Sequence, residues 1–325
     1  MKYTLDILLP LITIALTACL GLAVADATDS SQDFAPAKTA KHSQPNSDFE
    51  KQRQNAENQA RPEIEKQRKE AEQQAEKTLD KEAIAAIQET QNAINAIAAN
   101  KTDEALSALE RATGKIHILL ARNPATALIP VNLEVDVIDT APHDLNAIRE
   151  IAQDASKAVD DKNFPAARLL LQTLMSEIRV RTYNLPLATY PTALKDAARL
   201  LDQKKTKEAS DTLLTALNTL MVVDNVTPLP LVLAREAINQ AQTERQKDKN
   251  MALTLLETAK KEIQRSKELG YAGQDQEYAA LNNDIDNLEK QLKGNRDTMS
   301  VFSRLKEKLT AFVHRQSGAQ SAFKR

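Results

Sequence analysis

One apolar pattern occurs four times along this chain, and it constrains the fold more than any other feature. In each copy an alanine is followed by leucine after 4 residues, by alanine or leucine after 7, and by isoleucine or leucine after 11. The copies are Ala105-Leu109-Ala112-Ile116, Ala167-Leu171-Leu174-Ile178, Ala209-Leu213-Ala216-Leu220 and Ala252-Leu256-Ala259-Ile263. These offsets place all four side chains on one stripe of an α-helix. The pattern therefore predicts one helical building block that is used repeatedly.

Each copy is preceded by another apolar helical segment and by a short connection that contains lysine. These connections lie at residues 100–101, 161–163, 204–205 and 248–250. Short connections between helices indicate antiparallel hairpins. The chain also has only 6 glycines in 325 residues, which favours long helices over a loop-rich β fold. We therefore expect an all-α fold of stacked antiparallel hairpins, a helical bundle or a short solenoid, over residues 83–293.

The links between these hairpins are rich in proline, which ends helices and favours extended backbone. In the first and longest link Leu133, Val135 and Val137 alternate with Glu134 and Asp136. Strict alternation of apolar and acidic residues is typical of a strand with one buried face. We expect one short β segment near residues 131–138, which either lies on the bundle or pairs with a second chain.

The first 25 residues have the layout of a secretory signal peptide. Lys2 precedes an apolar run over residues 7–20, and Ala23-Val24-Ala25 has the form of a cleavage site. A lipoprotein signal is the alternative, because Leu16-Thr17-Ala18-Cys19 resembles a lipobox. We favour cleavage after Ala25 and a periplasmic location. Cys19 is the single cysteine, so the mature chain would contain no disulfide, no cysteine nucleophile and no zinc–thiolate site.

Polar and charged segments flank the hairpins. Residues 26–49 lack an apolar pattern and are expected to form a flexible linker. Residues 50–82 alternate acidic and basic side chains, which is typical of a charged, solvated helix or a disordered arm, and Pro62 is expected to break or start the helix. Residues 294–325 form a basic amphipathic tail. Its apolar residues are candidates for contact with a membrane or a partner, unless they pack on the chain's own bundle: Phe302, Leu305, Leu309 and Phe312.

Motifs that carry chemistry are scarce in the sequence. It contains no glycine-rich phosphate loop, no HExxH and no GxSxG. The best candidate site is a group around the first link, formed by Glu134, Asp136, Asp139, His143 and Asp144. Carboxylates with an imidazole can bind a divalent cation or respond to acid, but acidic residues beside Pro142 also suit an ordinary helix start. We assign no catalytic residue, no metal site and no cofactor.

The charge balance argues against nucleic acid as a partner. The chain has 43 basic and 45 acidic residues, and aromatic residues make up only 3%. Binding to phosphates needs a surplus of lysine and arginine, and stacking on bases needs aromatic side chains. We therefore expect the partners to be proteins or small molecules.

The linker segments carry a resemblance to a known family. The stretch Ala127-Leu128-Ile129-Pro130 continues as VNLEVDVIDTAPHDLNAIREIAQDA, and NFPAARLLLQTLMSEIRVRTYNLPLATYPTALKDAARLLDQKK follows from residue 163. Over roughly residues 80–270 the chain resembles the YfdX family of exported bacterial proteins. The resemblance implies a periplasmic, mostly helical, oligomeric protein encoded with acid- or heat-stress systems. It supplies no catalytic residues.

These observations lead to one preferred function and one alternative. We expect a non-enzymatic stress-tolerance protein that binds unfolded client proteins or a partner as a chaperone-like scaffold, and that forms homo-oligomers. Small amphipathic ligands are a further expected partner of this scaffold. The alternative is a module that binds or senses a small molecule or a cation through residues 128–145. Contact with a membrane is expected only through a lipid on Cys19 or through the tail helix.

Overall fold

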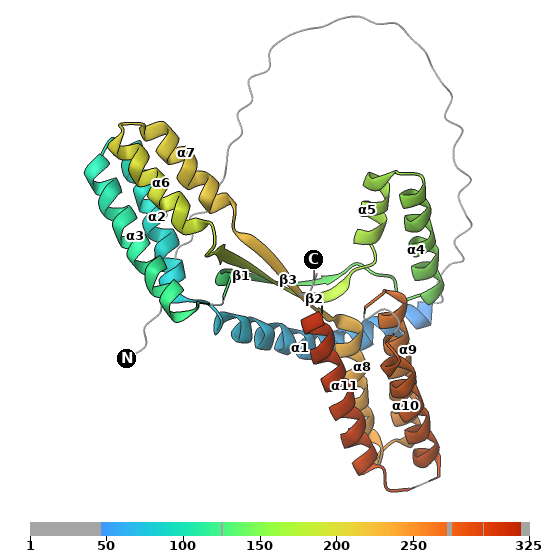
Figure 1. Cartoon of the computed structure of the whole chain (residues 1–325). Helices are drawn as coiled ribbons and strands as arrows, with labels where there is room; N and C mark the ends of the chain where they lie inside the picture. Colours follow the sequence, from blue (N-terminus) through green and yellow to red (C-terminus); the bar gives the residue numbers. More distant parts are fainter. Residues whose placement is uncertain (1–46, 125, 272–274, 295, 320–325) are drawn as a thin grey trace, which may run out of the picture. The chain divides into compact units, whose positions relative to one another are not determined.

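The computed structural model describes residues 47–124, 126–271, 275–294 and 296–319 (Figure 1). The described residues form eleven helices and three strands. The helices are α1 (Ser47–Glu76), α2 (Lys81–Ala98), α3 (Thr102–Arg122), α4 (Leu145–Asp160), α5 (Phe164–Gln172), α6 (Tyr190–Asp202), α7 (Thr206–Asn218), α8 (Leu229–Glu244), α9 (Lys249–Glu268), α10 (Glu277–Lys293) and α11 (Met299–Ala319). The strands are β1 (Leu128–Asp139), β2 (Ser176–Pro186) and β3 (Met221–Pro228). The expected fold class, helical hairpins with a small amount of β structure, is confirmed.

Two hairpins, α2–α3 and α6–α7, share the first apolar core. The repeated pattern supplies its centre, because Leu109 on α3 and Leu213 on α7 are both buried. Leu185 and Leu187, from the end of β2 and the residues after it, complete this core at one end. Pairing one hairpin with another removes both apolar stripes from water, which is the main free-energy gain of such a bundle.

Three of the hairpins are closed by the same turn. Asn100, Lys162 and Lys204 have positive φ angles of 58°, 57° and 61°. In each case the next residue donates its N–H to the carbonyl five positions earlier, as Lys205 does to Leu200 at 2.9 Å. This is the hydrogen-bond pattern of a helix C-terminus closed by a left-handed residue. Three of the four lysine-containing connections seen in the sequence are therefore tight turns of this kind between antiparallel helices.

The links between hairpins form a three-stranded antiparallel sheet in the order β1-β2-β3. The expected strand at 131–138 is the central part of β1, and it pairs with β2 of the same chain. The strands β2 and β3 were not expected from the sequence. The helix predicted from the second copy of the apolar pattern was too long, because α5 ends at Gln172 and Ile178 lies in β2. Ile178 and Val180 alternate there with arginines, which is a strand pattern.

The second core belongs to α8, α9, α10 and α11. Leu256 on α9 is completely buried in it. The tail residues proposed to touch a membrane or a partner lie inside this core: Phe302, Leu305, Leu309 and Phe312 are each at most 1% exposed. That expectation is therefore corrected, since a bundle of its own chain already covers the apolar stripe of α11.

The charged segment before the hairpins is helical. Pro62 lies within α1 and does not end it. Ile64 and Ala71 pack against a small apolar cluster of Ile178, Leu229 and Val232, and Arg235 donates to Glu63 at 3.0 Å. One face of α1 is therefore packed while the other remains charged. The expected signal peptide at 1–25, including Cys19, and nearly all of the linker at 26–49 lie outside the described residues.

Candidate functional site

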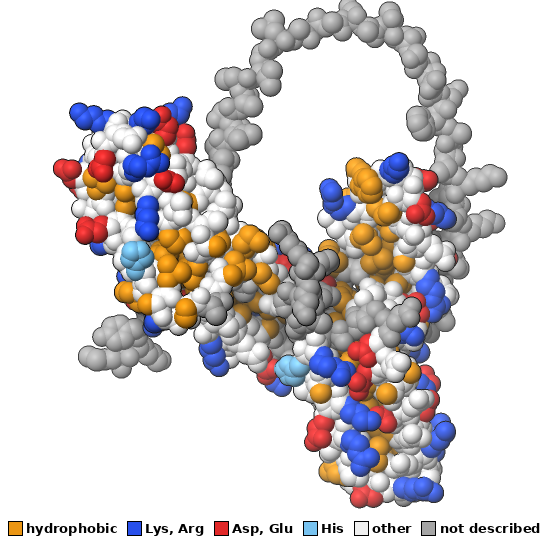
Figure 2. Space-filling view, in the orientation of Figure 1, with side chains coloured by type: hydrophobic (Ala, Val, Ile, Leu, Met, Phe, Trp, Pro, Cys, Tyr) orange, Lys and Arg blue, Asp and Glu red, His pale blue; other side chains and the backbone are white. Residues whose placement is uncertain are grey.

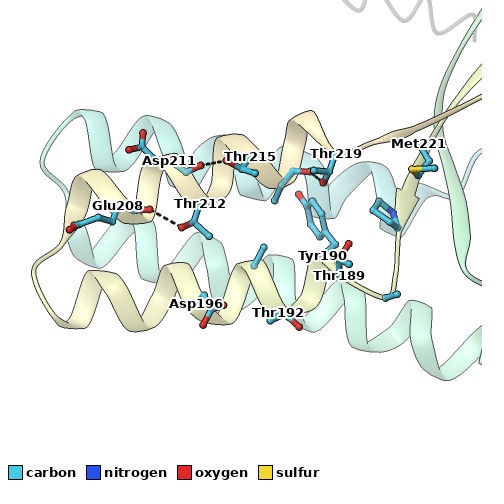
Figure 3. A pocket seen from close by; sticks show the side chains of 14 residues that line it. Thr189, Tyr190, Thr192, Asp196, Glu208, Asp211, Thr212, Thr215, Thr219 and Met221 are labelled. Carbon is cyan, nitrogen blue, oxygen red and sulfur yellow. Dashed lines mark hydrogen bonds between the residues drawn. The ribbon is translucent and has the colours of Figure 1, made fainter.

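In the described part of the chain, α6, α7 and the ends of β2 and β3 enclose an open groove of about 920 Å³. Figure 3 shows its side chains projecting from the two antiparallel helices. The residues that line it are Pro186, Ala188, Thr189, Tyr190, Thr192, Ala193, Asp196, Glu208, Asp211, Thr212, Thr215, Ala216, Thr219 and Met221. This volume lies within the range of small-ligand sites.

The strand-to-helix junction before α6 fixes one end of the groove. Pro191 occupies the first turn of α6, where a missing N–H costs nothing. The hydroxyl of Tyr190 donates to Thr90 Oγ1 on α2 at 2.7 Å, and Thr90 in turn donates to the carbonyl of Ala86. Burial raises the pKa of Tyr190 to about 12, because the ionised phenolate would lose its water. The phenol is therefore a neutral anchor that holds α6 on α2.

Threonine hydroxyls line the α7 side of the groove. Thr212 donates to the carbonyl of Glu208 and Thr215 to that of Asp211, both at 2.8 Å (Figure 3). Their protons are used within the helix, so each oxygen keeps lone pairs that can accept a hydrogen bond. This wall consequently offers acceptors to a ligand.

Carboxylates mark the end of the groove opposite Tyr190. Glu208 and Asp211 project from α7 and Asp196 from α6 (Figure 3). The lining contains no lysine, arginine or histidine, although Asp196 is bonded to the exposed Arg199 at 3.0 Å. A groove with an apolar floor, hydroxyl acceptors and an acidic end is suited to a ligand with an apolar body and positively charged donors.

Of the five residues proposed around the first link, Asp139 and His143 are joined through Arg265 and Glu262, and the other three make separate contacts. Glu134 and Asp136 lie on β1 opposite Arg181 and Arg179 of β2. Asp144 caps α4 by accepting the N–H of Asn146 at 2.8 Å. Nδ1 of His143 lies 4.0 Å from Oε1 of Glu262. Within the described residues no three histidine, cysteine or acidic side chains are grouped so that they could hold a metal ion.

Arg265 explains much of this arrangement and was missed by sequence reasoning. Its side chain is only 1% exposed, and it donates to Asp139 Oδ1 at 3.0 Å and to the carbonyls of Ala141 and Pro142 at 2.9 and 3.1 Å. An arginine with this many fixed acceptors is a structural clamp, here between α9 and the link before α4. In the sequence it resembles any charged helix residue.

None of the described helices is sufficiently long and apolar to cross a bilayer. Together, paired helical hairpins, a small antiparallel sheet and an open groove define a helical protein with a surface suited to binding.

Comparison with known proteins agrees with the resemblance seen in the sequence. Residues 86–226 match the model of the family described as YfdX protein, so the resemblance is confirmed over that part of the chain, from within α2 to within β3. The groove between α6 and α7 lies inside this region, whereas the C-terminal bundle lies beyond it. None of the curated proteins matches the chain.

A similar solved structure is that of YfdX from Salmonella Typhi. The two chains are 13% identical, with a TM-score of 0.32, and the alignment covers 46% of this chain and 93% of that one.

Proposed function

We propose that this chain is a non-enzymatic stress-tolerance protein of the periplasm, which holds amphipathic, basic segments of client proteins in the groove between α6 and α7. The observation that carries the proposal is the combination of apolar floor, threonine hydroxyls and acidic end in one open groove. Heat or acid exposes apolar segments of other proteins, and such segments aggregate unless another surface covers them. The resemblance to exported stress-associated proteins supports the same role.

The apolar floor and the charged end contribute differently. Burial of a client side chain gives about 25 cal/mol for each Å² of apolar area removed from water. The carboxylates of Asp196, Glu208 and Asp211 are exposed or partly exposed, so their attraction for lysine or arginine is weakened by salt. Affinity is therefore expected to fall as salt rises and to retain the part due to apolar contact.

A labelled peptide of alternating leucine and lysine clusters tests the groove directly. Thr215 is exposed on the groove wall, so Thr215→Trp fills the groove without disturbing a core. We expect this substitution to weaken peptide binding about tenfold, measured by fluorescence anisotropy, and to reduce the chain's suppression of the aggregation of a heat-denatured test protein.

Thr254→Trp is the matched control. Thr254 is an exposed threonine on α9 that bonds its own helix in the same way, to the carbonyl of Asn250 at 3.1 Å. Thr254→Trp should leave both peptide binding and the suppression of aggregation unchanged. Equal binding by wild type and Thr215→Trp, or an absence of aggregation suppression at several-fold molar excess, would refute the proposal.

A further inference from the structure

The strand β1 has one paired edge and one open edge. The order of the sheet is β1-β2-β3, so β1 pairs with β2 on one side only. Its register is regular from Asn132 to Asp139, and the irregularity in the pairing lies at the start of the strand, between Pro130 and Asn132. Open strand edges are commonly blunted by proline, lysine or a bulge. Residues 132–139 contain none of these, and a strand of 12 residues is long for an open edge.

The hydrogen bonds show which backbone groups of β1 point outward. Thr140 donates its N–H to the carbonyl of Met175 at 2.8 Å, in continuation of the strand register. In an antiparallel pair, residues that bond the partner strand alternate with residues whose N–H and C=O point away from it. Counted back from Thr140, Val137 and Val135 are of the second kind. In the described part of the chain, the backbone groups of these two valines make no hydrogen bond on the outer edge.

One face of β1 is apolar and only partly covered. Val135 packs against the small cluster that contains Ile178, whereas Val137, two residues further along the same face, is 40% exposed. Exposed apolar side chains also occur on other elements (Figure 2). Those of β1 differ because they lie beside backbone groups without a partner strand. A strand that paired with this edge would add its own apolar side chains to the same face.

The other face of this edge is acidic. Residues 131–139 carry three acidic side chains and no basic one. Arg179 lies opposite Asp136 in the sheet, but it pairs with Glu177 and Asp224. Asp136 is exposed and forms no ion pair with another described residue. Opposite charges on facing strands stabilise their pairing and like charges oppose it. A basic strand therefore suits this edge, whereas a second copy of β1 would place carboxylates against carboxylates.

We propose that the outer edge of β1 is a second client site, which adds an extended segment of alternating basic and apolar residues to the sheet. Strand addition takes its affinity from main-chain hydrogen bonds and its specificity from alternate side chains. The strand β2 shows the preferred chemistry, because its Arg179 and Arg181 face Asp136 and Glu134 across the inner edge of β1. As a client site the edge rests on the proposed function, and it extends that function from the groove to the sheet.

A fluorescent peptide with the sequence of Ser176–Asn184, the part of β2 that contains both arginines, tests the edge. The comparison peptide carries glutamate in place of the two arginines. We expect the full chain to bind the arginine peptide in an anisotropy titration and to bind the glutamate peptide about tenfold more weakly. The arginine peptide should also slow amide hydrogen exchange at Val135 and Val137, which lie outside the groove.

Val137→Pro tests the backbone of the edge. It removes one outward N–H and no bond to β2, and proline is tolerated in a strand at such a position. We expect it to weaken binding of the arginine peptide about tenfold. Val137→Ala is the matched control, because it shortens the same side chain and keeps the N–H, so it should retain most of the binding. Asp136→Lys changes an exposed side chain and should reverse the preference between the two peptides.

Circular dichroism should be the same for all variants. Val137→Pro should leave binding of the leucine–lysine peptide unchanged, and Thr215→Trp should leave binding of the arginine peptide unchanged, so failure of the edge and failure of the groove can be distinguished. Equal affinity for the two peptides, or equal binding by wild type, Val137→Pro and Asp136→Lys, would overturn the proposal. Absence of peptide binding would overturn it as well, and a change in the mass of the chain in solution on Val137→Pro would then assign the edge to a second copy.

Discussion

Individual buried polar residues hold the elements of this protein in register. Arg265 clamps the link before α4, and Tyr190 connects α6 to α2 through Thr90. Tyr271 accepts the N–H of Ser176 and donates to Glu177, both at 2.8 Å, and so joins the segment after α9 to β2. Buried polar groups cost free energy unless they are bonded, so each of these residues fixes one geometry and penalises others.

Ionisation of Tyr190 is expected to destabilise the folded chain at alkaline pH. Its pKa is raised from 10.0 to about 12 by burial, so the folded state retains the phenol proton more tightly than the unfolded state. Its contribution is fully present below pH 10 and is lost as pH rises from 10 to 12. We expect the urea midpoint to be constant near neutral pH and to fall above pH 10. Tyr190→Phe should lower the free energy of unfolding at pH 8 by about 1 kcal/mol. It should also make the alkaline slope shallower without abolishing it, because burial raises the pKa of Tyr271 and Tyr278 as well. A slope identical to that of the wild type would contradict this assignment.

At the scale of elements, the sequence predicts helices better than strands. The repeated pattern identified α3, α7 and α9 because three or four apolar residues on one stripe leave few alternatives. It failed in the second copy because Leu174 and Ile178 match the helical spacing by chance, while the alternation of Ile178, Arg179 and Val180 specifies β2. The groove was not predictable, since its width depends on how far apart α6 and α7 lie, and its threonines look like ordinary solvent-exposed positions.

Whether the tail helix α11 belongs to the second core can be tested by removing one of its buried side chains. Phe312 is completely buried, and its ring meets that of Tyr278 edge to face, with centroids 5.0 Å apart. We expect Phe312→Ala to lower the free energy of unfolding by about 3–5 kcal/mol, because it removes a large side chain from a packed core. The exposed Leu214→Ala should change it by less than about 0.5 kcal/mol. A loss from Phe312→Ala as small as that of the control, measured by urea unfolding, would mean that α11 does not belong to the core.

At the scale of the whole molecule, the described residues contain two large apolar cores that share no residue. One is formed by α2, α3, α6 and α7, and the other by α8 to α11. Hydrophobic stabilisation acts through contact, so two separate cores need not melt together. The sheet and buried residues such as Arg265 and Tyr271 join the parts, but they contribute far less apolar burial than either core.

We therefore expect calorimetry to resolve two thermal transitions. Leu109 and Leu256 occupy the same position in α3 and α9, and each is almost completely buried in its own core. Replacing either leucine with alanine should cost about 2–5 kcal/mol and lower the midpoint of one transition by about 10 °C. Leu109→Ala should move one transition and Leu256→Ala the other, because the cavity that each creates lies in a different core. If both variants shift a single common transition by the same amount, the two cores unfold as one cooperative unit, and the chain is a single thermodynamic domain despite its two separate sets of core residues.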